Sequence, residues 1–112
     1  MSQITTHILD TSEGKPAAGV NVVLENYSSG SWKQLSNGIT DNDGRVKNLL
    51  PLDKKIPRGI YRLIFDTRSY FKSIEVKGFY PSVTIEFEIT DDSHYHVPLL
   101  LNPFGYSTYR GS

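Results

Sequence analysis

The sequence predicts an all-β fold, an antiparallel β-sandwich of seven to eight strands with one short α-helix. Most of its 112 residues alternate between apolar and polar side chains, which is the period-two pattern of half-buried strands. Clusters of Gly, Pro, Asn, Asp and Ser separate these runs at short intervals, as in sandwich folds. The length fits one domain over residues 1–112, with neither a linker nor a repeat.

In the first half of the chain, β-branched residues and alternation favour four extended segments. A regular first segment would place His7 on the same face as Leu9. In the third segment, Trp32 and Leu35 are expected to be buried, and the Asn-Gly pair after it is expected to close the strand. In order, these segments span residues 3–10, 19–27, 31–36 and the piece that begins at 45–46, after the Asp-Asn-Asp-Gly turn at 41–44.

The second half contains the one predicted helix, from about Thr67 to Glu75. Asp66 or Thr67 can cap its N-terminus, and apolar residues recur at helical spacing from Tyr70 onward. The alternation resumes after the helix, and it is cleanest around residues 83–89. The extended segments predicted for this half are residues 59–66, 83–89, 94–101 and 106–109.

Composition restricts the possible partners of the chain. There is no cysteine, so disulfides, thiolate zinc sites and a cysteine nucleophile are excluded. Twelve basic residues balance twelve acidic ones, and this balance gives no reason to expect nucleic acid or a membrane surface. The N-terminus lacks the basic and apolar regions of a signal peptide. We therefore predict a small-molecule substrate and a cytoplasmic protein, or a periplasmic one if a signal peptide has been removed.

Three histidines, His7, His94 and His96, are the side chains best suited to transfer protons near neutral pH. Taken alone, each is more often a packed or solvated residue than a catalyst. His94 and His96 would project on the same side of a regular strand, whereas His7 comes from a distant one. Zinc is the alternative use of these histidines, but no carboxylate stands at matching spacing. We predict no metal and no cofactor, since nucleotide-binding and serine-nucleophile motifs are also absent.

The C-terminal segment is rich in aromatic and hydrogen-bonding groups up to its last residue, Ser112. Domain ends usually fray, so such a composition suits a tail that is ordered. The alternative is a short edge strand followed by a loose dipeptide, and the pattern alone leaves both open.

Three separated segments resemble signatures of the 5-hydroxyisourate hydrolases, which are transthyretin-like proteins. They are THILD at 6–10 with GKPA at 14–17, residues 40–46 with their Gly-Arg pair, and HVPLLL at 96–101 running on to YRGS at 109–112. Together they span nearly the whole chain. The terminal YRGS is the most specific of them, because hormone-carrying transthyretins share the fold but not that ending. The resemblance implies a transthyretin-like sandwich.

The resemblance also implies an activity and a site. The activity is metal-independent hydrolysis of 5-hydroxyisourate to 2-oxo-4-hydroxy-4-carboxy-5-ureidoimidazoline, in urate breakdown. The implied oligomer is a homotetramer, a dimer of dimers with the site in a channel between dimers. The implied catalytic residues are His7, Arg45, His96 and Ser112, and the implied substrate-binding residues are Arg45, Tyr109, Arg110 and Ser112.

Two other functions fit the same fold. One is a non-catalytic carrier that holds a small ligand in the same channel between subunits, and the other is a structural sandwich domain of the kind found in larger secreted proteins. A hydrophobic ligand would require matching polar groups to offset the desolvation of His7, Arg45 and His96. The polar residues therefore favour the hydrolase over the carrier.

Overall fold

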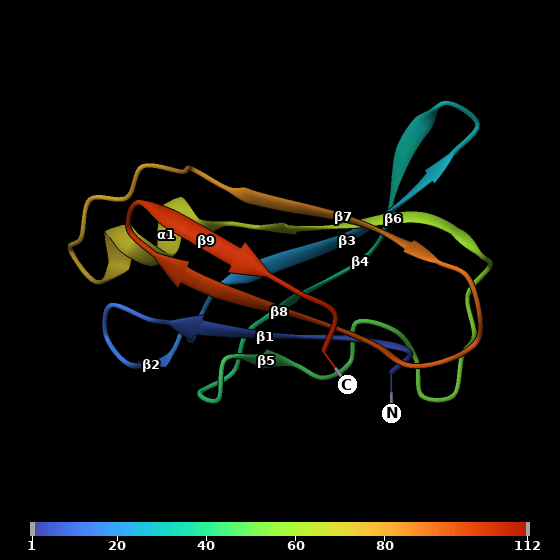
Figure 1. Cartoon of the computed structure of the whole chain (residues 1–112), viewed down its shortest axis with the longest axis horizontal. Coiled ribbons are helices and arrows are strands. Elements are labelled where there is room, and N and C mark those ends of the chain that lie inside the picture. Colours follow the sequence, from blue (N-terminus) through green and yellow to red (C-terminus); the bar gives the residue numbers. More distant parts are fainter. Residues whose placement is uncertain (1, 112) are drawn as a thin grey trace.

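Two β-sheets stack face to face in this computed structural model, which describes residues 2–111 (Figure 1). The first sheet has the order β2-β1-β8-β9, with β5 also paired to β1, and the second has the order β4-β3-β6-β7. The elements are β1 (Ile4–Asp10), β2 (Lys15–Pro16), β3 (Asn21–Ser28), β4 (Ser31–Ile39), β5 (Arg45–Val46), β6 (Gly59–Phe65), α1 (Thr67–Ser73), β7 (Val83–Ile89), β8 (Tyr95–Asn102) and β9 (Gly105–Thr108).

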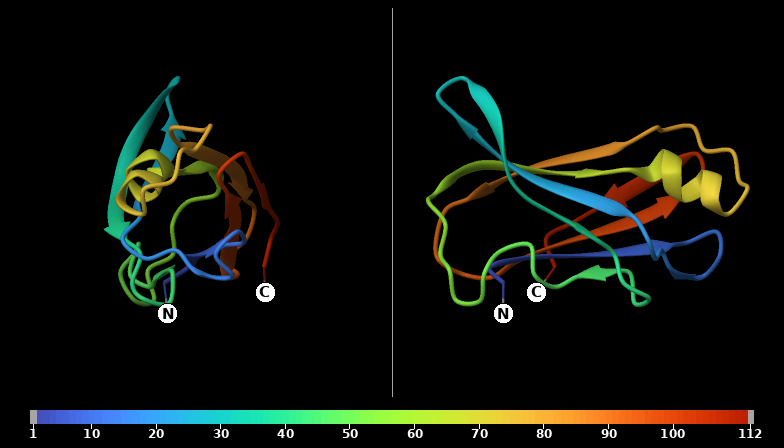
Figure 2. Two further views of the ribbon diagram at one scale, coloured as in Figure 1. Left: turned by 90° about the vertical axis from the view of Figure 1, so that its left-hand side faces the viewer. Right: turned by 180° about the vertical axis from the view of Figure 1, so that it is seen from behind.

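The hydrophobic core fills the space between the sheets. The alternation of side chains along the strands directs one face of each sheet into this core. β1, for example, buries every second residue from Ile4 to Asp10 and leaves the residues between them half-buried on the outer face. Figure 2 shows the two layers from the end and from behind, with the β3–β4 hairpin projecting beyond the sandwich. The largest fully buried side chains include Tyr61, Phe65 and Phe71. Within residues 2–111, no helix is long and apolar enough to cross a membrane.

The predicted two-sheet sandwich is confirmed, with one correction to its strand directions. β1 and β8 pair in parallel, from Ile4 opposite Tyr95 to Asp10 opposite Leu101, so the sheet is not antiparallel throughout. Only short hairpins force antiparallel pairing, and these two strands are far apart in the sequence. In the described residues, seven strands have four residues or more, and two have only two residues.

β4 differs from its prediction in length and in what it buries. The strand continues through the Asn-Gly pair to Ile39, three residues beyond the predicted end. Leu35 is 46% exposed, because a bulge interrupts the register with β3. Ser36 faces Leu24 and Gln34 faces Glu25, which leaves Leu35 as the extra residue. The expected burial of Leu35 was therefore wrong, and Trp32 is only half-buried.

The predicted helix is present, but α1 ends two residues earlier than expected, at Ser73. Asp66 caps it by accepting a hydrogen bond from the Ser69 backbone amide at 3.1 Å. At the other end, Glu75 has a φ of +59°, a left-handed conformation that ends a helix. Tyr70 and Phe71 provide the buried face.

Tyr70 also ties α1 to the end of β1 through Asp10, a carboxylate with no exposed surface. The Tyr70 hydroxyl donates to one carboxylate oxygen at 2.6 Å. The other oxygen accepts from the Ser12 amide, the Ser12 hydroxyl and the Glu13 amide. Although burial alone would raise the pKa of Asp10, these hydrogen bonds lower it below 3.8. The buried charge is thus matched by donors, as a stable fold requires.

We expect Tyr70→Phe to lower the free energy of unfolding by about 1–3 kcal/mol, because a buried acceptor loses its donor. Urea unfolding followed by circular dichroism would measure the loss. The matched control is Tyr27→Phe, since Tyr27 is 47% exposed, and it should change stability by less than about 0.5 kcal/mol. Equal effects from both variants would contradict the structural role of the Tyr70 hydroxyl.

Candidate functional site

Strand pairing brings three of the predicted site residues together on the outer face of the first sheet. His7 lies at the centre of β1, and its partner across β5 is Arg45. On the other side of β1, His96 is the partner of Thr5 and lies one diagonal step from His7. Paired residues project on the same side of a sheet. Residues 7, 45 and 96, distant in sequence, therefore share one surface.

Two adjoining hollows open on this surface. The first, of about 460 Å³, is lined by Thr5, Thr6, Arg45, Val46, Lys47, His94 and His96. The second, of about 420 Å³, is lined by His7, Pro16, Asp43, Arg45 and Lys47. Arg45 and Lys47 belong to both, so two cations lie between the two imidazole-bearing halves. This arrangement suits a small, flat, oxygen-rich molecule.

The surroundings of His96 favour its neutral form. Burial lowers the pKa of His96 below 6.5, and the charges of His94, His7 and Arg45 lower it further. A neutral imidazole near pH 7 can accept a proton, as a general base must.

Two residues at this site were missed by the sequence reasoning. The Thr5 hydroxyl lies 2.8 Å from Nε2 of His94 and 2.8 Å from Nδ1 of His96. Lys47, two positions after Arg45, lines both hollows. Threonine is common on strands for its shape alone, so only the three-dimensional pairing distinguishes Thr5. Lys47 could have been predicted from the sequence, because a residue two positions after Arg45 projects on the same side of an extended segment.

The C-terminal tail folds back over His96. The Gly111 amide donates to the His96 carbonyl at 2.8 Å, which forms an isolated bridge beyond β9. Of the two alternatives that the sequence left open, this bridge favours an ordered tail as far as Gly111. Ser112, predicted to be catalytic, lies outside the described residues.

Gly111 leaves no room for a side chain beside the imidazole. A Cβ there would lie 2.7 Å from Cδ2 of His96 and 3.3 Å from Cγ of Pro98. Gly111 therefore packs directly against the ring, and together with the hydrogen bond between Thr5 and Nδ1 it fixes the ring's orientation. Nε2 remains as the nitrogen available to a bound molecule.

We expect Gly111→Ala to lower the turnover of a substrate bound in these hollows about 10- to 100-fold, since the added methyl must displace the His96 ring. Steady-state kinetics would measure the loss, and an unchanged melting temperature would show that the fold is intact. Gly105→Ala is the control in the same C-terminal hairpin, because its Cβ would meet only Asn102, at 3.8 Å. Equal turnover by the two variants would show that the tail does not position His96.

The structure does not bring Tyr109 and Arg110 into either hollow. The Arg110 guanidinium lies 4.1 Å from the centroid of the Tyr95 ring, and it donates to the Ser93 hydroxyl and the His94 carbonyl. Tyr109 and Arg110 line a different cavity, of about 290 Å³, beside β7. Arg110 thus holds the tail in place, and neither residue contacts the hollows within this chain.

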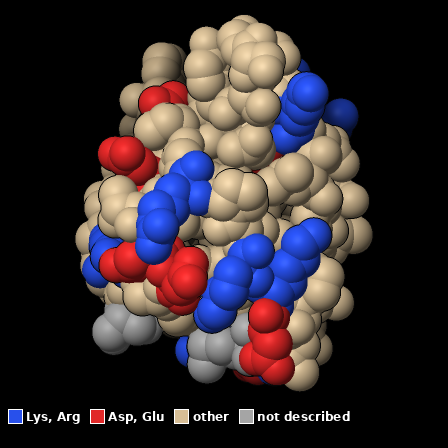
Figure 3. Space-filling model, turned by 90° about the vertical axis from the view of Figure 1, so that its right-hand side faces the viewer, with Lys and Arg blue, Asp and Glu red and all other residues tan. Residues whose placement is uncertain are grey.

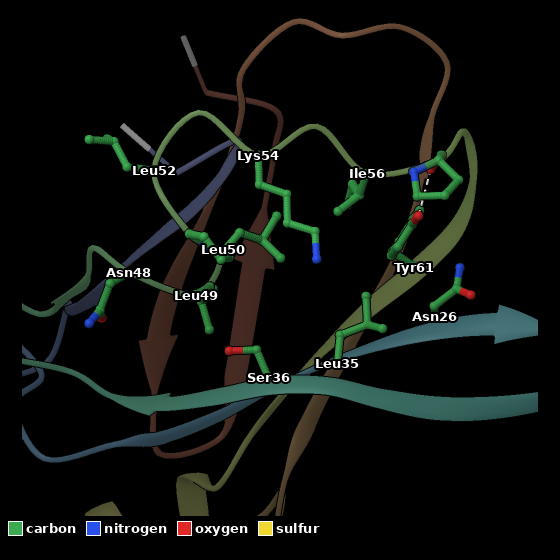
Figure 4. Close-up of a pocket in the computed structure, with 12 residues that line it drawn as sticks. Asn26, Leu35, Ser36, Asn48, Leu49, Leu50, Leu52, Lys54, Ile56 and Tyr61 are labelled. Carbon is green, nitrogen blue, oxygen red and sulfur yellow. Dashed lines mark hydrogen bonds between the residues drawn. The ribbon is translucent and has the colours of Figure 1, made fainter.

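A cavity larger than these two hollows lies elsewhere. It measures about 670 Å³ and lies between β4 and the irregular segment 48–57 (Figure 4). Its lining includes the bulged Leu35, together with Lys54 and Ile56, and it contains no histidine. Size alone would select this cavity, but the proton-transferring groups all lie on the first sheet. The smaller hollows are therefore the better candidate.

Among residues 2–111, no three His, Cys, Asp or Glu side chains form a group that could hold a metal ion. On the face shown in Figure 3, basic and acidic side chains are interspersed. This mixture gives that face no extended field of a single sign.

Comparisons with known proteins identify the family and the fold of the chain. The model of the HIUase/Transthyretin family matches residues 4–111. A 5-hydroxyisourate hydrolase of Salmonella dublin is 52% identical over 110 residues, covering 97% of this chain and 80% of that protein. Among solved structures, sea bream transthyretin in complex with thyroxine has a TM-score of 0.92 at 31% identity, covering 98% of this chain and 95% of that one. The 5-hydroxyisourate hydrolase of Klebsiella pneumoniae has a TM-score of 0.86 at 37% identity, covering 97% and 98%.

Proposed function

The chain belongs to the HIUase/Transthyretin family, and we propose that it hydrolyses 5-hydroxyisourate to 2-oxo-4-hydroxy-4-carboxy-5-ureidoimidazoline in urate breakdown. The observation that carries this proposal is the convergence of His7, Arg45 and His96 on one face of the first sheet. The 52% identity to a 5-hydroxyisourate hydrolase supports the substrate.

The chemistry requires water to attack a carbonyl of a six-membered ring. Water is a poor nucleophile at neutral pH, so a neutral imidazole accepts its proton, a contribution of about 10²- to 10⁴-fold. His96 performs this step through Nε2, because its ring is fixed and its lowered pKa keeps it neutral. His7, in the adjoining hollow, orients the ring from the other side.

Arg45 stabilises the negative charge that develops on the attacked carbonyl oxygen. A guanidinium aimed at that oxygen binds the transition state more tightly than the ground state. Its planar fork also matches the flat substrate better than an ammonium would. Ser112 orients substrate or water, a role that rests on the sequence resemblance, and Arg110 contributes by anchoring the tail before it.

We further propose that the protein acts as a homotetramer, a dimer of dimers, in the cytoplasm, with residues 1–112 as one domain. The hollows lie on an outer sheet face of a single chain, so a second copy facing them would enclose the substrate and exclude water. Large exposed aromatic residues near β9 support association, with Phe104 73% and Tyr106 42% exposed. Light scattering coupled to size exclusion would measure the mass of the assembly.

Fold likeness alone does not separate a hydrolase from a carrier, since the thyroxine-bound sea bream protein aligns very well. The residues in the hollows make the distinction. An apolar ligand placed there would desolvate Arg45, Lys47 and two imidazoles without returning their hydrogen bonds. Hydrolysis of a polar ring uses the same groups productively.

The decisive experiment follows the decay of freshly generated 5-hydroxyisourate by ultraviolet absorbance, with and without the protein. We expect decay to accelerate in proportion to protein concentration. The same assay in EDTA tests the zinc alternative, and we expect the rate to be unchanged. An unchanged rate of decay in the presence of the protein would refute the proposed function. A loss of activity in EDTA that added zinc restores would support a metal site.

A further inference from the structure

One hydroxyl group bridges two imidazoles at the edge of the proposed active site. Oγ1 of Thr5 lies 2.8 Å from Nε2 of His94 and 2.8 Å from Nδ1 of His96. The two rings are nearly parallel, with centroids 6.3 Å apart and planes inclined by 24°. Backbone pairing holds this arrangement, because Thr5 and His96 are partners across β1 and β8.

The number of protons in this cluster couples the two histidines. A threonine hydroxyl carries one hydrogen, so it can donate to only one of the two ring nitrogens and must accept from the other. If Thr5 donates to His94, then Nδ1 of His96 carries a proton and Nε2 of a neutral His96 is free to accept one. If Thr5 donates to His96, neutral His96 carries its proton on Nε2. The tautomer of one ring therefore sets that of the other.

Both rings are held in the neutral form that this coupling requires. Burial lowers the pKa of His94, and Lys55 and Arg110 lower it further. Burial likewise lowers the pKa of His96, together with the charges of His94, His7 and Arg45. Near pH 7 both imidazoles are therefore able to accept a proton.

We propose that Thr5 is a positioning residue that links His96 to His94 in a proton relay, which rests on the hydrolysis proposed above. As the water oxygen bonds to the ring carbonyl carbon, the carbonyl π pair moves to its oxygen and the water proton moves to Nε2 of His96. The Nδ1 proton of His96 passes to Oγ1 of Thr5, and the Thr5 proton passes to Nε2 of His94. His94 then holds the positive charge.

The second half of the reaction reverses the relay. The oxyanion pair re-forms the carbonyl π bond as the carbon–nitrogen bond breaks. The electron pair of that broken bond stays on the leaving nitrogen, which takes the proton from Nε2 of His96. The Thr5 proton returns to Nδ1 of His96, and His94 returns its proton to Thr5. The water proton ends on the leaving nitrogen, and all three side chains regain their starting state. His96 thus serves first as base and then as acid. The positive charge stays on His94 between the two steps, away from the Arg45 guanidinium.

The test compares Thr5→Val with Thr5→Ser. Valine keeps the branched shape but removes the hydroxyl, so we expect kcat to fall about 10- to 100-fold while KM changes less than about twofold. Serine restores the hydroxyl and should recover most of the lost kcat. His94→Gln should lower kcat similarly, and combining it with Thr5→Val should add little, because both remove one relay.

A second measurement does not depend on activity. In protein with ¹⁵N-labelled histidine, the ring-nitrogen NMR signals report each tautomer, and Thr5→Val should change the tautomer populations of both His94 and His96. Equal loss of kcat in Thr5→Val and Thr5→Ser, or additive effects of Thr5→Val and His94→Gln, would overturn the relay. So would His94 signals that do not respond to Thr5→Val. An inactive wild-type protein would instead refute the proposed hydrolysis, and the NMR comparison would still decide the coupling.

Discussion

His96→Ala is expected to lower kcat for 5-hydroxyisourate about 10²- to 10⁴-fold, the contribution of a positioned general base. The structure supports a large effect because Thr5 fixes Nδ1 and Gly111 packs against the ring. Only Nε2 is then left to meet water. His7→Ala should also lower kcat severely, since His7 completes the second hollow. Stopped-flow absorbance would measure both variants against wild type.

Two further variants separate chemistry from packing. His96→Phe retains a ring against Gly111 but has no nitrogen, so it should be as inactive as His96→Ala. Added free imidazole can fit the space left by alanine but not the space filled by phenylalanine. It should therefore restore part of the activity of His96→Ala and none of the activity of His96→Phe. Wild-type rates in both His7→Ala and His96→Ala would refute the assignment, and an active His96→Phe would reduce His96 to a packing role.

Local sequence pattern predicted most strands and the helix because alternation and capping are local properties. The differences arose where partners distant in sequence decide the outcome. Leu35 is apolar, but the bulge opposite Leu24 and Glu25 turns it outward. The parallel direction of β8 depends on β1, about 90 residues earlier, and no local signal in the alternation encodes it.

The site was predicted by the family resemblance rather than by spacing. His7 and His96 stand on different strands, and only the register of β1 with β8 and β5 brings them near Arg45. The sequence could not identify Thr5 as a site residue. Its hydroxyl contacts a ring nitrogen of His96 on β8 and one of His94 in the turn before β8, and both are distant in sequence. The substrate contact of Arg110 stays a prediction, and within this chain its guanidinium lies over the Tyr95 ring.

Arg45→Ala is expected to lower kcat about 10²- to 10³-fold, the usual loss when one stabilising donor to an oxyanion is removed. The free energy of unfolding of the Arg45→Ala variant should differ from that of wild type by less than about 0.5 kcal/mol, because Arg45 is exposed on a two-residue strand. Arg45→Lys keeps the charge but not the planar fork, so it should recover only part of the loss. Arg68→Ala, which removes a cation from α1, is the control for net charge.

The same substitution has a second expected effect, on pH dependence. Arg45 contributes to lowering the pKa of His96 below 6.5, so its removal should raise that pKa. The activity of a neutral base is lost as pH falls through its pKa, and the acid limb of the kcat/KM profile should therefore move to higher pH in Arg45→Ala. Arg68→Ala should leave the limb in place. If Arg45→Ala lowered kcat without moving the acid limb, the guanidinium would act on the substrate alone. If neither kcat nor the acid limb changed, Arg45 would have no part in the reaction. A combined change is the result that places the cation beside both the developing oxyanion and the base.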